Sequence, residues 1–129
     1  MSSWVAVCTK RQLIPERGVA VLVEDQQVAL FLVRAGEDEF VHAVGHRDPF
    51  SDANVVARGI VGSVGARDTV ASPMYKHVFD LTTGECVTDP SVRLPVYRTW
   101  IAGGVVYVQV TPLREGADPA LAEPVEVAV

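Results

Sequence analysis

The most informative segment of the chain runs from Ser72 to Gly84 and reads Ser72-Pro73-Met74-Tyr75-Lys76-His77-Val78-Phe79-Asp80-Leu81-Thr82-Thr83-Gly84. A Ser-Pro pair opens the segment, a mainly apolar run covers residues 77–81, and a Thr-Thr-Gly tripeptide closes it. A short apolar run bounded by turn residues is typical of a β-strand, and the closing tripeptide is compact enough to begin a hairpin. We therefore predict a strand at 77–81 that leads from a proline-bearing loop into a tight turn.

Similar apolar runs recur on both sides of this segment. About one residue in five is valine, and β-branched side chains favour strands over helix interiors. The runs cover residues 19–23, 28–33, 39–44, 60–64, 69–72, 85–88, 95–102 and 105–110, with a Gly-Gly turn at 103–104. Short strands at this spacing, without a long helical period, predict an all-β domain built as a small antiparallel barrel or sandwich. Trp4 and Trp100 fall in predicted strands, and we expect both in the core.

Only one or two short helices are expected. Thr9 is placed to cap a turn that ends at Leu13, and Ser51 or Asp52 is placed to cap a short helix over residues 54–57. Residues 1–113 are therefore expected to form a single β domain. Residues 114–129 carry two prolines and four acidic residues with little to bury, which predicts a flexible acidic C-terminal tail.

The composition excludes several classes of protein. The 129 residues include 11 Lys and Arg against 16 Asp and Glu, a net charge of −5. Nucleic acids and anionic membranes are polyanions that bind through Lys and Arg clusters, so we expect neither as a partner. No window approaches the roughly 20 apolar residues of a membrane-spanning helix, and the N-terminus lacks an export pattern. Two cysteines do not make a disulfide scaffold, and we expect a reduced, cytoplasmic protein.

Three histidines, His42, His46 and His77, are candidate metal ligands. His42 and His46 are four residues apart, a spacing that brings side chains together on a helix but not on the strand expected there. His46, Asp48 and His77 have the composition of a two-histidine, one-carboxylate iron site, although ordinary turn residues explain the same pattern. Cys8 and Cys86 stand alone, which favours small buried thiols. The residues alone thus predict a β domain without chemistry of its own, with a mononuclear metal site as the alternative.

Two segments resemble the cluster-binding loops of Rieske-type proteins, which follow C-x-H and C-P-x-H-G-x-x-F-D-x-x-T-G. They are residues 45–50, Gly-His-Arg-Asp-Pro-Phe, and residues 72–84. The frame of the second pattern is kept at Pro73, Phe79, Asp80, Thr83 and Gly84. All four ligand positions are replaced: Asp48 and Ser72 stand at the two cysteines, and Phe50 and Tyr75 stand at the two histidines. Because a Rieske centre is held by two thiolates and two imidazoles, we expect no cluster and no metal on this chain.

A Rieske-like chain without these ligands is similar to the small subunits of the NAD(P)H-dependent assimilatory nitrite reductases. The similarity covers about residues 4–110, and its most specific parts are Arg58-Gly59-Ile60 and the Ser-Pro-x-x-Lys run at 72–76. The resemblance implies an antiparallel Rieske-like sandwich or barrel with two ligand-type hairpin loops at one tip. It also implies a cytoplasmic partner, a large catalytic subunit that carries flavin, an iron–sulfur cluster and sirohaem and reduces nitrite to ammonium. This chain is then expected to be a non-catalytic accessory subunit without a cofactor of its own.

A tip that holds no iron is available for partner binding. We expect an aromatic patch at Phe50 and Tyr75, with Arg47, Lys76 and His77 beside it, because such a composition is typical of interface cores. The alternative for both aromatic residues is that they turn inward and fill the space of the cluster.

Two further expectations concern the polar residues of the tip. Asp48 precedes a proline and is expected to accept backbone N–H groups in a turn, while Arg58 is expected to brace the loop by pairing with Asp48 or Asp52. Two other functions stay open: a Rieske-type or mononuclear-metal electron-transfer protein, and a Rieske-like module of another oxidoreductase.

Overall fold

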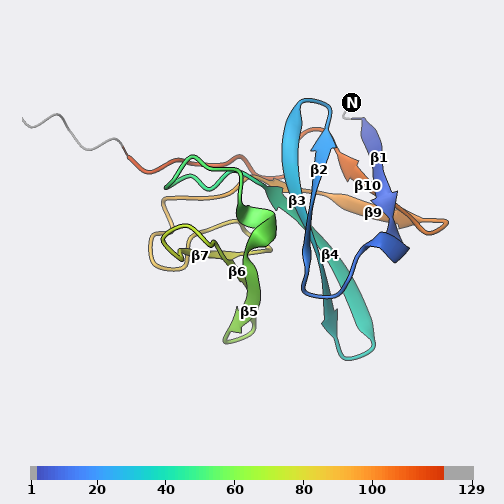
Figure 1. Cartoon of the computed structure of the whole chain (residues 1–129), viewed down its shortest axis with the longest axis horizontal. Coiled ribbons are helices and arrows are strands. Elements are labelled where there is room, and N and C mark those ends of the chain that lie inside the picture. Colours follow the sequence, from blue (N-terminus) through green and yellow to red (C-terminus); the bar gives the residue numbers. More distant parts are fainter. Residues whose placement is uncertain (1–2, 121–129) are drawn as a thin grey trace, which may run out of the picture.

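The computed structural model describes residues 3–120, and its regular structure is almost entirely β-strand. Within these residues the elements are β1 (Trp4–Thr9), η1 (Lys10–Gln12), β2 (Gly18–Val23), β3 (Gln26–Ala35), β4 (Asp38–Gly45), η2 (Val56–Arg58), β5 (Ile60–Val64), β6 (Arg67–Ala71), β7 (Val78–Asp80), β8 (Val96–Tyr97), β9 (Thr99–Ala102) and β10 (Val105–Gln109) (Figure 1). The two η elements are short 3-10 helices. None of the helices in this part of the chain is long and apolar enough to cross a membrane. The prediction of an all-β chain with one or two short helices is therefore confirmed.

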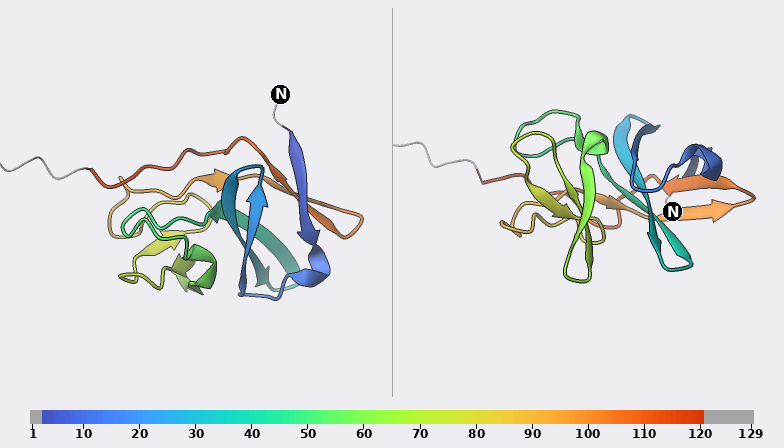
Figure 2. Two further views of the ribbon diagram at one scale, coloured as in Figure 1. Left: turned by 45° about the horizontal axis from the view of Figure 1, so that its top comes forward. Right: turned by 60° about the horizontal axis from the view of Figure 1, so that its bottom comes forward.

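The strands form three antiparallel sheets. Their orders are β5-β6-β7, β2-β3-β4-β8 and β1-β10-β9. Figures 1 and 2 show β2, β3 and β4 between the other two sheets. This arrangement places the turn between β6 and β7 at one side of the molecule and the β1-β10-β9 sheet at the other.

The middle sheet has a hydrophobic core on each face, because β3 is apolar at every position from Val28 to Val33. Ala29, Phe31 and Val33 belong to one core cluster, which includes Phe79 of β7. Val28, Leu30 and Leu32 belong to the other, which includes Val106 and Val108 of β10. Successive side chains on a strand point to opposite faces, so the alternation follows from strand geometry. A continuous apolar run is the pattern of a strand buried on both sides.

Residues 85–88 do not form the strand expected from the sequence. Glu85 and Cys86 make only isolated bridges, to Arg93 and Phe79. The Cys86 N–H instead bonds to the carbonyl of Val92 at 2.9 Å, across a turn of the chain. Because of this turn, residues 85–88 do not pair regularly with a neighbouring strand. Their apolar pattern, which is typical of a strand, therefore lies in a loop.

The second short helix begins later than expected and is capped by another residue. It starts at Val56, and no side chain caps it in the way expected of Ser51 or Asp52. His46 supplies acceptors instead: its carbonyl accepts the N–H of Val56 at 3.0 Å, and its Nδ1 accepts the N–H of Ala57 at 3.1 Å. The first N–H groups of a helix need acceptors from outside the helix, and here a residue of the preceding loop provides them.

Trp4 and Trp100 are not core residues, which corrects the expectation from the sequence. Trp4 is 44% exposed and Trp100 is 62% exposed. Trp100 is the cross-strand partner of Tyr107, whose chain neighbours Val106 and Val108 are fully buried. Because a strand offers alternate residues to its two faces, the register gives the inner face to valine and leaves the aromatic residues outside.

The first residues of the expected tail are hydrogen-bonded to the domain. Arg114 bridges to Val96, and Ala117 bridges to Arg93 in both directions, at 2.8 and 2.9 Å. The paired chain thus continues past the boundary at 113 that we expected. Residues 121–129, the remainder of the expected tail, lie outside the described residues.

Candidate functional site

Two loops that carry the four former ligand positions are joined by a buried hydrogen bond. Loop 1, residues 46–55, follows β4, and loop 2, residues 72–77, connects β6 to β7. The Ser72 hydroxyl of loop 2 donates to Asp48 Oδ2 of loop 1 at 2.5 Å, and both residues are at most 1% exposed. The two positions that correspond to cysteines therefore touch each other directly.

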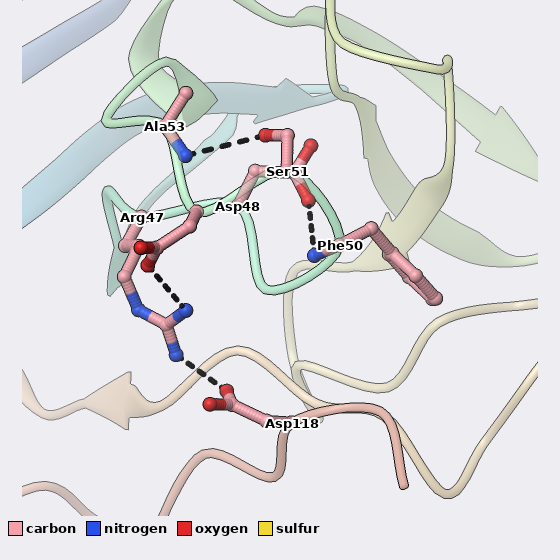
Figure 3. A network of polar contacts seen from close by, with 7 residues as sticks. Arg47, Asp48, Phe50, Ser51, Ala53 and Asp118 are labelled. Atoms are coloured by element: carbon pink, nitrogen blue, oxygen red, sulfur yellow. Dashed lines mark hydrogen bonds and ion pairs between the residues drawn. The ribbon is translucent and has the colours of Figure 1, made fainter. Parts of the chain in front are cut away.

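The carboxylate of Asp48 also organises its own loop. Its Oδ1 accepts the N–H of Phe50 at 2.8 Å (Figure 3), and the N–H of Asp48 bonds to the carbonyl of Ala53 at 2.8 Å. The role expected for Asp48, a turn aspartate that accepts a backbone N–H, is thus observed, with a cross-loop contact in addition. Both carboxylate oxygens have a donor, which is what a fully buried polar side chain requires.

Phe50 turns inward and fills space beneath the two loops. Its ring stacks on His77, with ring centroids 3.7 Å apart and planes 10° apart, and lies 6.2 Å from the ring of Phe79. It also packs against the core cluster that contains Phe79. We expected Phe50 either in a surface patch or turned inward, and the structure supports the inward position. His77 stacks on Phe50 and is not part of an outer aromatic patch.

Tyr75, in contrast to Phe50, points to solvent. It is 71% exposed, its neighbour Met74 is 38% exposed, and Lys76 is exposed as well. Tyr75 and Lys76 both have positive φ, 57° and 55°, a conformation that L-residues other than glycine rarely adopt. Lys76 stands at the glycine of the Rieske loop pattern, so a long side chain here takes a backbone conformation that glycine adopts without steric cost.

Arg47 is paired within the chain. Its guanidinium bonds to Asp52 at 3.1 Å and to Asp118 of the C-terminal segment (Figure 3). The hydrogen bond with Asp118, together with the two nearby negative charges, outweighs burial and raises the pKa of Arg47. It is Arg47, and not Arg58 as expected, that pairs with Asp52. Nothing in the sequence indicates the contact with Asp118, because the two residues are 71 positions apart.

His46 is buried and held as a neutral acceptor. Burial lowers its pKa, and the positive charge of Arg58 lowers it further. Because Nδ1 accepts the N–H of Ala57, that nitrogen has no lone pair left for a metal. His42 is near Asp68, with Nε2 to Oδ2 at 3.6 Å, and burial lowers its pKa despite the nearby carboxylate. Over residues 3–120, no three His, Cys, Asp or Glu side chains are grouped to hold a metal ion. His46, Asp48 and His77 therefore do not form a metal site.

The donor set of the two loops does not fit a [2Fe–2S] cluster. A Rieske centre needs two thiolates and two imidazoles. Here the corresponding residues are a carboxylate and a hydroxyl bonded to each other, a phenyl ring packed in the core and an exposed phenol. Hard oxygen donors do not replace thiolates around sulfide-bridged iron.

Asp80 secures the turn that follows β7. Its Oδ2 accepts from Arg67 Nε at 2.6 Å, and its Oδ1 accepts the N–H groups of Thr82 and Thr83 at 2.7 and 3.2 Å. Burial alone would raise the pKa of this carboxyl, but these donors outweigh it and the pKa lies below its usual value. The Asp-x-x-Thr-Gly part of the motif is therefore a structural turn that supports loop 2.

A hollow lies between loop 1 and the C-terminal segment. Its lining includes the basic residues His46, Arg47 and Arg93 and the acidic residues Glu115 and Asp118. Charges of both signs thus face the same space, and the lining favours no single class of ligand.

Comparisons with known proteins agree with the motif positions. The sequence matches the family of Rieske-like [2Fe-2S] domains over residues 3–109. The nitrite reductase (NADH) small subunit of Escherichia coli K12 is 34% identical over 109 residues, which are 84% of this chain and 99% of the relative. A crystal structure from Mycobacterium tuberculosis, provisionally described as an NADH-dependent nitrite reductase small subunit, is 46% identical with a TM-score of 0.79, covering 84% of this chain and 96% of that one.

One relative carries the matched segment inside a much longer chain. A nitrite reductase [NAD(P)H] large subunit of Klebsiella oxytoca is 30% identical over 105 residues, which are 81% of this chain and 11% of the relative. The small subunit of E. coli, in contrast, is matched over almost its whole length. The chain therefore belongs to the family of Rieske-like [2Fe-2S] domains and, within it, to the nitrite reductase small subunits.

Proposed function

We propose that this chain is the non-catalytic small subunit of an NAD(P)H-dependent nitrite reductase, and that it acts by binding the large catalytic subunit without a cluster of its own. The observation that carries the proposal is the 2.5 Å hydrogen bond between Ser72 and Asp48 at the two cysteine positions. Asp48 and Ser72, at the two cysteine positions, are bonded to each other, and Phe50 is packed beneath them, so these positions offer no thiolate to iron.

The relatives support a large subunit as the partner. Those matched along their length are named small subunits, and the Klebsiella relative, named a large subunit, includes a similar segment within one polypeptide. A domain that occurs both as a separate subunit and joined to a larger chain is well suited to work next to that chain. By resemblance the large subunit supplies flavin, iron–sulfur cluster and sirohaem, and the complex reduces nitrite to ammonium. Its use of NAD(P)H makes the cytoplasm the proposed compartment.

The test is reconstitution from separately purified subunits. We expect the isolated chain to be colourless and inactive, and NAD(P)H-dependent ammonium formation by the large subunit to rise when the chain is added. The control is an unrelated acidic protein added at the same concentration. Nitrite reduction by the chain alone would contradict the non-catalytic role, and a Rieske-type visible absorption would support an electron-transfer protein in place of this proposal. A large subunit that neither binds the chain nor responds to it would contradict the proposed partner.

A further inference from the structure

We infer that the tip of loop 2, formed by Met74, Tyr75 and Lys76, is the surface that docks onto the large subunit of nitrite reductase. This inference rests on the function proposed above and adds where the contact lies and what chemistry it requires. It narrows the expected patch of Arg47, Phe50, Tyr75, Lys76 and His77 to its outward-facing part.

The first observation is exposure. Tyr75 and Met74 are large apolar residues in solvent at the end of a short loop, with the Lys76 side chain next to them. Tyrosine is one of the residue types enriched among the few residues that dominate interface energetics. Phe50 and His77 lie stacked behind this tip, and Arg47 is already paired with two carboxylates.

The second observation is backbone strain. Tyr75 and Lys76 both adopt the left-handed conformation, where glycine carries no steric penalty. Two adjacent non-glycine residues in this region are unfavourable for folding, so stability alone does not explain them. Residues held in such conformations cluster at functional sites, where the surrounding structure maintains them.

The third observation is that the two ends of the loop are held in place by contacts within the chain. The Ser72 N–H bonds to the carbonyl of His77 at 2.9 Å and closes the loop at its base. The Ser72 hydroxyl bonds to Asp48, and the His77 ring stacks on Phe50. A preorganised loop loses little conformational entropy on binding, which favours affinity.

The charges of the tip define the partner surface. Lys76 forms no ion pair with the described residues, although the chain as a whole carries a net charge of −5. A lysine without an ion-pair partner at the tip of an acidic protein is best matched by a carboxylate on the partner surface. We therefore assign to the large subunit an apolar pocket for Tyr75 and Met74 with an acidic residue opposite Lys76.

The experiment measures binding of full-length variants to the purified large subunit by calorimetry. We expect Tyr75→Ala to weaken binding at least about 30-fold, as for an interface hot spot. Trp100→Ala is the matched control, since Trp100 is a similarly exposed aromatic residue on the opposite sheet, and it should change the dissociation constant less than about twofold.

Lys76→Gly separates a docking role from a structural one. Removing the side chain relieves the positive-φ strain, so the midpoint of thermal unfolding should rise by about 2–4 °C. Binding should nevertheless weaken by about tenfold, and the difference from wild type should shrink at high salt because it is electrostatic. If Lys76 had only a structural role, its replacement would not raise stability and weaken binding at the same time.

The outcomes separate the two proposals. Wild-type chain that binds, with Tyr75→Ala and Lys76→Gly binding equally well, would overturn the docking site and leave the proposed function intact. Loss of binding in Trp100→Ala alone would move the interface to the β1-β10-β9 sheet and also overturn the inference. Wild-type chain that does not bind the large subunit at all would contradict both proposals.

Discussion

The Ser72 hydroxyl and the Asp48 carboxylate hold loop 2 to loop 1 by a hydrogen bond, at the positions where two thiolates bound to one iron hold these loops together in a Rieske protein. Both residues are buried, and the second carboxylate oxygen is occupied by the Phe50 N–H. At the scale of single residues, loop 1 and loop 2 are therefore joined by a side-chain hydrogen bond and an aromatic stack.

This contact predicts a measurable loss of stability. Ser72→Ala removes the donor and leaves one oxygen of the buried Asp48 carboxylate without a partner, which costs about 1–3 kcal/mol. The free energy of unfolding, measured by urea titration, should fall by that amount. Ser63→Ala, at an exposed position of β5, is the control and should change it by less than about 0.5 kcal/mol. Equal stability of the two variants would show that the hydrogen bond does not hold the loops.

Asp80 makes an acid-sensitive contribution at the same scale. Its pKa is lowered in the folded protein, so its stabilising contacts are fully present above the usual carboxyl value and are lost as pH falls through the lowered one. Asp80→Asn keeps an acceptor for the turn but removes the charge opposite Arg67. We expect the variant to be less stable than wild type at pH 7, with the difference closing below about pH 4. A difference that stays constant from pH 7 to pH 2 would contradict this assignment.

Among the elements, the turn after β7 depends on glycine for two reasons. Gly84 has φ of +78°, and a Cβ at this position would lie 2.1 Å from the carbonyl oxygen of Leu94. Gly65, in the turn between β5 and β6, also has positive φ, at +61°, but has no atom within 4 Å of such a Cβ. Both glycines thus have a positive φ, but only Gly84 is packed closely against another segment of the chain.

This difference gives a paired prediction. Gly65→Ala carries only the conformational penalty, about 1 kcal/mol. Gly84→Ala adds a collision with backbone and should cost at least about 3 kcal/mol or prevent folding. Thermal unfolding of both variants measures the contrast. A Gly84→Ala protein as stable as Gly65→Ala would mean that the loop at Leu94 is not packed against this turn.

Local pattern predicts some elements and misplaces others, for identifiable reasons. The valine-rich runs of β2 and β3 were predictable because their apolar residues are continuous and bounded by turns. Trp100 was misplaced because Ile101 beside it is also apolar, so alternation does not say which faces inward. Pairing with β10 sets Trp100 opposite Tyr107 and Ile101 opposite the buried Val106, and Trp100 is the more exposed of the two, at 62% against 38%. That pairing is a tertiary fact that a local pattern does not contain.

For the whole molecule, three sheets around two cores support a pair of loops whose motif is readable in the sequence. The replaced ligand positions, Asp48, Phe50, Ser72 and Tyr75, were predictable because each stands at a fixed place in a local pattern. Which of them face inward was not, since that depends on the stack between Phe50 and His77. The pairing of Arg47 with Asp118 was also not predictable, because it joins distant segments of the chain.

The central claim is that a Rieske-like scaffold serves here without a cluster, and electron paramagnetic resonance tests it most directly. The full chain is incubated anaerobically with iron and sulfide, desalted and reduced, with a Rieske ferredoxin carried through the same steps as the positive control. We expect the ferredoxin to give the signal of a reduced [2Fe–2S] centre and this chain to give none, with no iron retained. A stoichiometric [2Fe–2S] signal from this chain would contradict the account.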